Sequence, residues 1–245
     1  MPEIILQHVT KRFDKFVAVQ DLDLQIQDRG FITLLGPSGC GKTTTLRMIA
    51  GLETPTSGRI LIDGVPVFDS EKGINLPPNK RDIGFLFQNY ALWPHMTVYE
   101  NIAYGSEKAT REDVERVCKA CGIHDYIRTL PAGYETVLED DGANISKGQK
   151  QLMTIARAML LESSLLILDE ATSNVDTRTE LRIQKAMRTL MADKTCFVIA
   201  HRLSTIRNAD MILVVRDGEI VERGTHESLM QGDTFYRHLY NAQFA

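Results

Sequence analysis

The chain has 245 residues, of which 43% are hydrophobic, and a formal net charge of −4. These values allow one large or two small soluble domains with a sizeable core, and they give no electrostatic argument for nucleic-acid binding. No apolar run approaches the ~20 residues that a membrane-spanning helix needs, and no signal peptide precedes Ile4. We therefore expect a protein of the cytosol, or of the cytosolic face of a larger assembly.

The first third of the chain is typical of β-structure. Residues 3–35 alternate apolar and polar side chains, and the last of these runs, FITLL at 31–35, predicts a buried strand. Residues 59–68 predict a hairpin around Gly64, and residues 77–79 (PPN) predict a loop. A short buried strand is expected next, over residues 83–87.

The remainder alternates helical patterns with short apolar runs. Charged helical stretches dominate residues 98–160. Alternating strands and helices favour an α/β core with a mainly parallel sheet, interrupted by a helical insert around 89–160. The later elements are expected to be a strand at 165–168, a helix at 177–192, a strand at 196–200 and a hairpin over 211–222.

The four cysteines do not suggest a disulfide framework in a chain of this length. Cys118 and Cys121 have a metal or redox spacing, but no second pair follows them. Their segment has a helical pattern, so we interpret them as two helix thiols in a reducing compartment.

The most specific motif runs from Gly36 to Thr43 (GPSGCGKT), between the strand predicted at 31–35 and a helix predicted over 43–52. It fits the phosphate-binding pattern G-x-x-x-x-G-K-[ST] at every fixed position. Glycines let several N–H groups aim at one point, and the helix N-terminus adds partial positive charge. Lys42 brings a full charge to the outer phosphates, and the Thr43 hydroxyl can hold Mg²⁺. The alternative is a Gly-rich turn without a ligand; the complete pattern favours a nucleoside triphosphate site.

Three further side chains follow short apolar runs. Asp169 ends the run at 165–168, where a carboxylate beside a phosphate loop can hold Mg²⁺. Glu170 can orient or deprotonate an attacking water. His201 follows the strand CFVIA, whose carboxyl end should lie at the ligand crevice, so it can hydrogen-bond a γ-phosphate. Each alone has a plainer interpretation: an acidic strand end, or a surface or core histidine.

A second candidate anion site begins at Ser146, in the sequence SKGQ. A serine before a helix is usually an N-cap. A flexible Ser-x-Gly at a helix start is also a site for an anion. Spacing alone does not choose between these two interpretations.

Together these residues resemble the nucleotide-binding domain of ATP-binding cassette (ABC) transporters, over nearly the whole chain. The resemblance implies a P-loop NTPase fold, with a RecA-like, mainly parallel sheet core, an antiparallel β-subdomain and an inserted α-helical subdomain. It predicts a single ABC ATPase domain, in which 1–88 and 161–245 form the β-subdomain and core, and 89–160 form the helical subdomain. The matching motifs are Walker A (36–44), the Q-loop (Gln88), the signature (145–149), Walker B (165–169) with Glu170, the D-loop (173–176) and the switch histidine (His201).

The resemblance also implies the ligands, ATP and Mg²⁺, and the roles of the site residues. Glu170, His201 and Lys42 would be catalytic, and Thr43, Gln88 and Asp169 would hold the metal. Phe13 would stack on adenine, with Phe16 as the competing choice, and either is alternatively a core residue. The remaining ATP contacts would come from Gly36, Pro37, Ser38, Gly39, Cys40, Gly41, Lys42, Thr43, Thr44 and, across a head-to-tail homodimer, Ser146, Gly148 and Gln149.

Two features depart from the family pattern. Lys147 stands where the signature usually has glycine. Its long side chain could crowd the dimer interface, or its ammonium could add a phosphate contact; we expect it to be tolerated, because the middle signature position can face outward. Up to about Gly105 the chain resembles an importer ATPase, and from about Asn101 an exporter ATPase. We therefore hypothesise an engineered chimera, with a natural outlier subfamily as the alternative. The exporter-like markers are LPAGYETV, Ala171 after Glu170, IAHRLSTIRNAD and GEIVERGTHESL.

The resemblance implies ATP binding and hydrolysis through an ATP-sandwich dimer, with a membrane subunit as partner and no nucleic acid. If the chain is a chimera, no single membrane subunit is an obvious partner and coupling to transport is doubtful. The competing hypothesis is a nucleotide-binding module that folds but does not turn over or couple. The sequence does not name a transported substrate, because the family recognises substrates through its membrane subunits.

Overall fold

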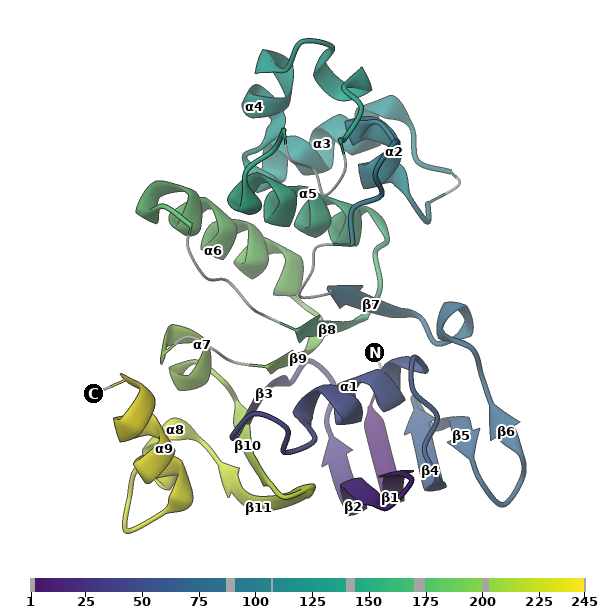
Figure 1. Cartoon of the computed structure of the whole chain (residues 1–245), viewed down its shortest axis with the longest axis vertical. Helices are drawn as coiled ribbons and strands as arrows, with labels where there is room; N and C mark the ends of the chain where they lie inside the picture. The colour runs from purple at the N-terminus through teal and green to yellow at the C-terminus, as the bar shows by residue number, and fades with distance from the viewer. Residues whose placement is uncertain are drawn as a thin grey trace. The chain divides into compact units, whose positions relative to one another are not determined.

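The computed structural model describes residues 3–86, 91–106, 108–139, 144–169, 175–199 and 203–244 (Figure 1). Backbone contacts divide the chain into two compact units. The first unit is Met1–Phe85, Ser164–Glu170 and Asp193–Ala245, and the second is Leu86–Ser163 with Ala171–Ala192. The helical subdomain expected at 89–160 falls within the second unit, and its boundaries stay a prediction.

The first unit contains a five-stranded antiparallel sheet in the order β2-β1-β4-β5-β6. Strand β1 lies between β2 and β4, and its Ile4 lies opposite Ile26 on one side and Ile62 on the other. The predicted hairpin around Gly64 is confirmed as β4 and β5. The strands are β1 (Ile4–Phe13), β2 (Phe16–Ile26), β4 (Ser57–Ile62), β5 (Val65–Asp69) and β6 (Ile74–Asn75).

A six-stranded sheet in the same unit has the order β11-β10-β3-β9-β8-β7. The pairs β10–β3, β3–β9 and β9–β8 are parallel, and β11 closes the edge as an antiparallel hairpin with β10. Parallel strands are buried on both faces, which explains their continuous apolar runs. The strands are β3 (Phe31–Leu35), β7 (Ile83–Leu86), β8 (Leu165–Asp169), β9 (Thr195–Ile199), β10 (Met211–Arg216) and β11 (Glu219–Gly224).

Helix α1 (Lys42–Ala50) contributes Leu46, Met48 and Ile49 to a core that also contains residues of both sheets. A smaller cluster forms around Tyr236 and Ile206, under the helices at the end of the chain. These are α7 (Leu203–Arg207), α8 (His226–Leu229) and α9 (Phe235–Phe244). The mainly parallel core and the antiparallel sheet confirm the predicted α/β fold class.

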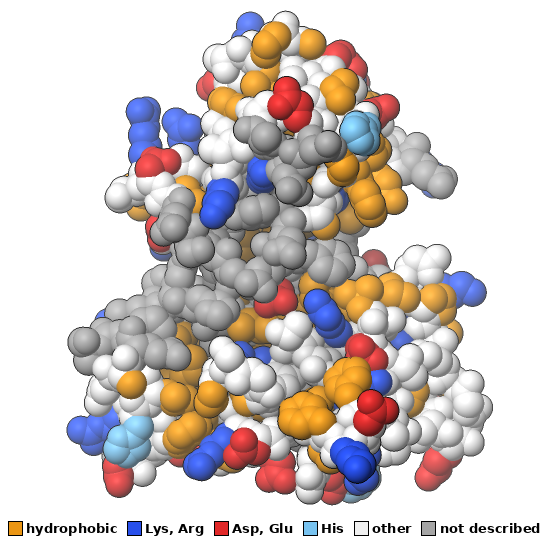
Figure 2. Space-filling view, in the orientation of Figure 1, with side chains coloured by type: hydrophobic (Ala, Val, Ile, Leu, Met, Phe, Trp, Pro, Cys, Tyr) orange, Lys and Arg blue, Asp and Glu red, His pale blue; other side chains and the backbone are white. Residues whose placement is uncertain are grey.

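The second unit is helical. Helix α5 buries Leu152, Met153 and Ile155 in the core of this unit. The helices are α2 (Val98–Ala103), α3 (Arg111–Cys121), α4 (His124–Thr129), α5 (Lys147–Leu160) and α6 (Thr177–Met191). Among the described helices, none is both long and apolar enough to cross a bilayer. On the face shown in Figure 2, acidic and basic side chains are interspersed.

Two local predictions need correction. The expected loop at Pro77–Asn79 contains a 3-10 turn, η1 (Pro78–Lys80), in which the N–H of Lys80 donates to the Pro77 carbonyl at 3.0 Å. Proline at the start of this turn presets the backbone angle that the turn needs. Helix α1 ends at Ala50 rather than Leu52, because Gly51 adopts a left-handed conformation (φ 77°) and caps it.

The paired cysteines of α3 are buried thiols. Burial raises the pKa of Cys118 to about 11 and that of Cys121 to about 12. The Cys121 Sγ lies 3.5 Å from the Met159 Sδ of α5. The two thiols are therefore packed into the helical core in their protonated form, in agreement with the interpretation as ordinary helix cysteines.

Candidate nucleotide-binding site

The loop between β3 and α1 is held tightly between two strands. A Cβ added to Gly36 would lie 2.1 Å from the Val215 carbonyl oxygen of β10. A Cβ added to Gly41 would lie 2.3 Å from the Ala18 carbonyl oxygen of β2, and Gly41 also has φ 106°. Larger residues would therefore displace the loop, so these two glycines are required by the close approach of the backbone.

The first turn of α1 faces the loop with open donors. Its N-cap is Gly41, which has no side chain to accept a hydrogen bond from the N–H groups of the first turn. Helix starts leave N–H groups without intrahelical partners and carry partial positive charge. The first turn of α1 also contains no acidic residue. This end of the helix is chemically suited to an external anion such as a phosphate.

Lys42 turns back over the same loop. Its Nζ donates to the carbonyl oxygens of Gly36 and Pro37, both at 2.8 Å, and lies 3.5 Å from the Cys40 Sγ. The ammonium group thus lies within the loop, and these three contacts are all with neutral groups. A phosphate in the loop would offer it a charged acceptor, and the attraction between two opposite charges would add to the hydrogen bond.

Asp169 lies at the same edge of the sheet as the loop. Leu34 of β3 pairs with Ile199 of β9, and Ile199 pairs with Asp169 of β8. Two strand spacings place the Asp169 backbone roughly 10 Å from that of Leu34. Thr43, in the first turn of α1, is partly exposed, as is Asp169. A hydroxyl and a carboxylate are the hard oxygen ligands that Mg²⁺ prefers, so this donor set fits the expected ion.

Several predicted site residues fall outside the described residues. These are Gln88, Glu170 and His201, together with the first part of the D-loop, Ser173 and Asn174. Their proposed roles as metal ligand, water-orienting base and γ-phosphate contact remain predictions.

The two candidate aromatic residues form one cross-strand pair. Phe13 and Phe16 lie opposite each other at the tip of the β1–β2 hairpin, 44% and 59% exposed. The Lys11 Nζ lies 4.6 Å from the centroid of the Phe13 ring and so covers one of its faces. Ala18 of β2, two residues after Phe16, lies against the phosphate loop. The β1–β2 hairpin that carries the two rings therefore flanks the loop, neither ring is a core residue, and the choice between them stays open.

The signature segment begins α5 in the second unit. Ser146 is its N-cap: the Ser146 hydroxyl accepts from the Gln149 N–H at 3.4 Å, and the Gln149 Oε1 accepts from the Ser146 N–H at 2.9 Å. This capping box confirms the N-cap interpretation. A Cβ on Gly148 would lie 2.4 Å from the Thr179 Cγ2 of α6, so Gly148 allows α5 and α6 to approach. Lys147 is exposed, which agrees with a side chain that does not crowd its own unit.

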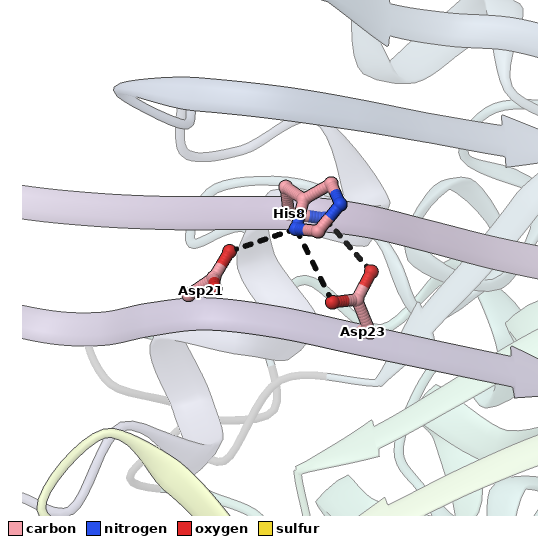
Figure 3. Close-up of side chains that lie close together, drawn as sticks. All are labelled: His8, Asp21 and Asp23. Atoms are coloured by element: carbon pink, nitrogen blue, oxygen red, sulfur yellow. Dashed lines mark hydrogen bonds and ion pairs between the residues drawn. The ribbon is translucent and has the colours of Figure 1, made fainter.

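A separate polar cluster lies on the outer face of β1 and β2 (Figure 3). The His8 Nδ1 lies 3.0 Å from the Asp21 Oδ1 and 3.4 Å from the Asp23 Oδ2. The hydrogen bond to Asp21, and then the charges of Asp23 and Asp21, raise the pKa of His8. All three side chains are exposed, and the cluster is explained by these ion pairs.

Comparison with known proteins decides the family. A family model described as ABC transporter matches residues 19–173, which is more than half of the chain and includes both the phosphate loop and Asp169. The chain belongs to the ABC transporter family. It is an ATP-binding domain of that family, whose domains hydrolyse ATP, and the predicted P-loop NTPase fold is confirmed.

Individual ABC proteins match the chain over most of its length. A fatty acid ABC transporter ATP-binding/permease protein from Mycobacterium bovis is 48% identical over 212 residues, which are 86% of this chain and 33% of that protein. An ATP-dependent lipid A-core flippase from Ralstonia nicotianae is 40% identical over 248 residues, covering 99% of this chain and 41% of the flippase. The chain thus spans between a third and about two fifths of the length of these two curated relatives.

A solved structure agrees with the fold. A bacterial Atm1-family ABC exporter with ATP bound superimposes with a TM-score of 0.88 at 34% identity, covering 100% of this chain and 42% of the exporter. The ABC domain described here is therefore similar in sequence and structure to the ATP-binding part of exporter-type transporters.

One buried group near the site was not predicted from the sequence. Arg81 is 3% exposed and donates hydrogen bonds to the last turn of α1. It lies next to Lys80 in a charged run, NKRD, and Lys80 is exposed. Composition does not show which of two neighbouring cations is buried; the only signal is that Arg81 precedes the apolar run of β7.

Proposed function

We propose that this domain binds Mg-ATP in the loop from Gly36 to Thr44 and hydrolyses it in a head-to-tail dimer. The observation that carries the proposal is the start of α1, where uncapped N–H donors and the Lys42 ammonium point at one loop. Phosphoryl transfer depends mainly on positioning and on charge stabilisation, which such a loop supplies.

The residues of the first unit have distinct roles in this proposal. Lys42 would exchange its loop carbonyl partners for the outer phosphates. Thr43 and Asp169 would hold Mg²⁺ with help from Gln88. When bound, the ion supplies neutralising charge between the phosphates. Phe13, or Phe16 in its place, would stack on adenine; adenine over guanine is assigned from the family.

Hydrolysis needs groups beyond this loop. Glu170 would orient the attacking water, and His201 would contact the γ-phosphate. Ser146, Gly148 and Gln149 of a second subunit would close the site, so that two ATP molecules join two domains. Catalysis by the isolated domain is then expected to rise faster than linearly with protein concentration.

The names of the relatives support an exporter-type partner. The Mycobacterium bovis protein is described as ATP-binding and permease in one chain, and the Ralstonia protein as a flippase. We propose that this domain acts on the cytosolic face of a membrane, energising a transmembrane part of comparable type. No transported substrate is assigned to it.

The test is calorimetry with Mg²⁺ and a non-hydrolysable ATP analogue, followed by phosphate release at increasing protein concentration. We expect binding by the wild-type domain, binding weakened roughly tenfold or more by Lys42→Ala, and turnover that depends on dimerisation. Equal heats from both proteins would remove the loop from the proposal. Binding together with turnover that is strictly linear in protein concentration would remove the dimer.

The second candidate is a nucleotide-binding module without turnover. The observation in its favour is Ser146, whose hydroxyl is already committed to the N-cap of α5. Analogue binding without any phosphate release, at protein concentrations where a dimer is present, would establish this function instead.

The hypothesis of an engineered chimera stays a prediction. Single natural proteins align with this chain on both sides of Gly105. A natural outlier subfamily accounts for such alignments without a chimera. Separate comparison of residues 1–105 and 106–245 is the test. A single natural relative that matches both halves equally well would contradict the chimera.

A further inference from the structure

Arg81 is a buried cation held by carbonyl and side-chain amide oxygens. It is 3% exposed, and no carboxylate pairs with it in the part of the chain that the structure describes. Burial lowers the pKa of its guanidinium to about 10, so it is still charged at neutral pH. Taking an unpaired charge out of water is costly unless its hydrogen bonds are satisfied. The fold therefore keeps this charge buried in spite of the free energy needed to remove it from water.

Four hydrogen bonds join the guanidinium to two parts of the first unit. On one side, Nη1 donates to the carbonyl oxygens of Met48 and Ile49, at 2.8 and 2.9 Å, in the last turn of α1. On the other side, Nε donates to the Leu76 carbonyl at 2.8 Å and Nη2 to the Asn75 Oδ1 at 3.1 Å. The planar group thus bridges α1 to the end of β6 and to Leu76, the residue that follows it.

Both sides of this bridge are fixed. The last carbonyls of a helix lack intrahelical partners and carry partial negative charge, so they are strong acceptors for a cation. A Cβ on Gly51, the C-cap of α1, would lie 2.6 Å from the Arg81 Nε, which shows how closely the guanidinium is fitted to the helix end. The N–H of Leu76 donates to the Val67 carbonyl at 2.8 Å, which ties the other side to the five-stranded sheet.

Helix α1 is only nine residues long, about 13 Å from end to end. Its first residues are Lys42 and Thr43, and its last turn is held by Arg81. We propose that Arg81 is a positioning residue that fixes α1 along its axis and thereby sets the place of Lys42 and Thr43 in the nucleotide site. The inference rests on the proposed binding of Mg-ATP to this loop. The positioning role follows from geometry, because a small displacement of Lys42 and Thr43 is enough to weaken nucleotide binding strongly.

The primary test compares Arg81→Gln and Arg81→Lys with the wild-type domain. Calorimetry with Mg²⁺ and a non-hydrolysable ATP analogue is done at a temperature where circular dichroism shows each variant to be folded. We expect Arg81→Gln to raise the dissociation constant roughly fivefold or more. Arg81→Lys should give a smaller rise, because an ammonium keeps the charge but lacks the planar fork that reaches both sides.

Two other arginines serve as matched controls. Arg157 of α5 is also a partly buried arginine bonded to carbonyl oxygens, those of Asn101 and Ala91, both at 2.7 Å, but within the second unit. Arg157→Gln should lower the melting temperature without changing analogue affinity. Arg47 is exposed in the last turn of α1, so Arg47→Gln removes a charge at the same helix end but no bridge. An equal loss of affinity in Arg81→Gln and in either control would overturn the proposal.

A wild-type measurement covers the case in which Arg81→Gln does not fold. Coupling between two sites is reciprocal, so nucleotide binding should in turn strengthen the Arg81 bridge. We expect saturating analogue to slow hydrogen exchange of the Arg81 Nε–H in NMR spectra roughly fivefold or more, and that of the Arg157 Nε–H much less. Unchanged exchange at Arg81, or equal slowing at both arginines, would contradict a positioning role. Absence of analogue binding to the wild-type domain would instead mark a failure of the proposed function.

Discussion

The two helices that begin with predicted phosphate-binding sequences start in opposite ways. Helix α1 begins at Gly41, with no side-chain cap and no acid in its first turn. Helix α5 begins at Ser146, whose capping box with Gln149 satisfies two donors from within the chain. A cap of this kind stabilises a helix by about 1 kcal/mol. The comparison shows what makes a helix start available to an anion within one subunit. The N–H groups of the first turn must be left without a capping side chain.

Lysine occupies the first position of both helices, and this gives the largest expected effect. The Lys42 Nζ donates to two loop carbonyls, whereas Lys147 is exposed. We expect Lys42→Ala to weaken binding of a Mg-ATP analogue by roughly tenfold or more, because hydrogen bonds to charged groups contribute about 1.5–3 kcal/mol. Calorimetry measures this effect, with Lys147→Ala as the control whose affinity should not change. Equal losses in both variants would mean that charge alone, and not the loop, sets the affinity.

Gly148 gives the next largest effect, on stability. The Cβ of Gly148→Ala would meet the Thr179 Cγ2 at 2.4 Å and the Val175 Cγ1 at 2.9 Å. Overpacking of this kind lowers the free energy of unfolding by about 1–3 kcal/mol, so the denaturant concentration at the unfolding midpoint should fall. The double variant Gly148→Ala with Thr179→Ser removes the nearer methyl group and should recover part of the loss. Without any recovery, the contact between α5 and α6 would not explain the need for glycine.

The sequence predicted the start of α1 well and the start of α5 only as a pair of alternatives. The loop pattern from Gly36 to Thr43 is long and specific, and its glycines are required by contacts with Ala18 and Val215. The serine pattern at Ser146 is short, and the capping box depends on a rotamer that no spacing fixes. Arg81 was missed because its burial depends on contacts with Met48 and Ile49 of α1, more than thirty residues earlier in the chain. Local patterns predict local hydrogen bonds; they do not predict which cation a tertiary fold will bury.

Removing the serine cap separates its structural role from its proposed role in the dimer. Ser146→Ala should lose about 1 kcal/mol of unfolding free energy, because the Gln149 N–H loses its acceptor. The matched variant is Thr110→Ala, which opens a capping box of the same type at α3, where no nucleotide contact is proposed. Both should show similar losses in denaturant titrations, but only Ser146→Ala should also reduce phosphate release. Equal turnover in the two variants would leave Ser146 with the capping role alone.

The smallest expected effect is the pH dependence of stability at the capped start of α3. The Asp113 carboxylate completes the box of α3, and its pKa is lowered to about 2, first by the hydrogen bond from Arg116 and then by those from Thr110. A folded-state pKa below the ordinary value of 3.8 means that this group stabilises the fold above pH 3.8. The contribution is lost as the pH falls through about 2.

An NMR titration of the Asp113 side chain measures this pKa directly. Arg116→Gln should move the midpoint upward toward the ordinary value, since it removes the largest cause of the shift. An unchanged midpoint would assign the shift to the hydrogen bonds from Thr110 instead. Helix α1 has no acid in its first turn that titrates in this way. A carboxylate there would satisfy the same donors that a phosphate needs, so its absence is what keeps the start of α1 available to a ligand.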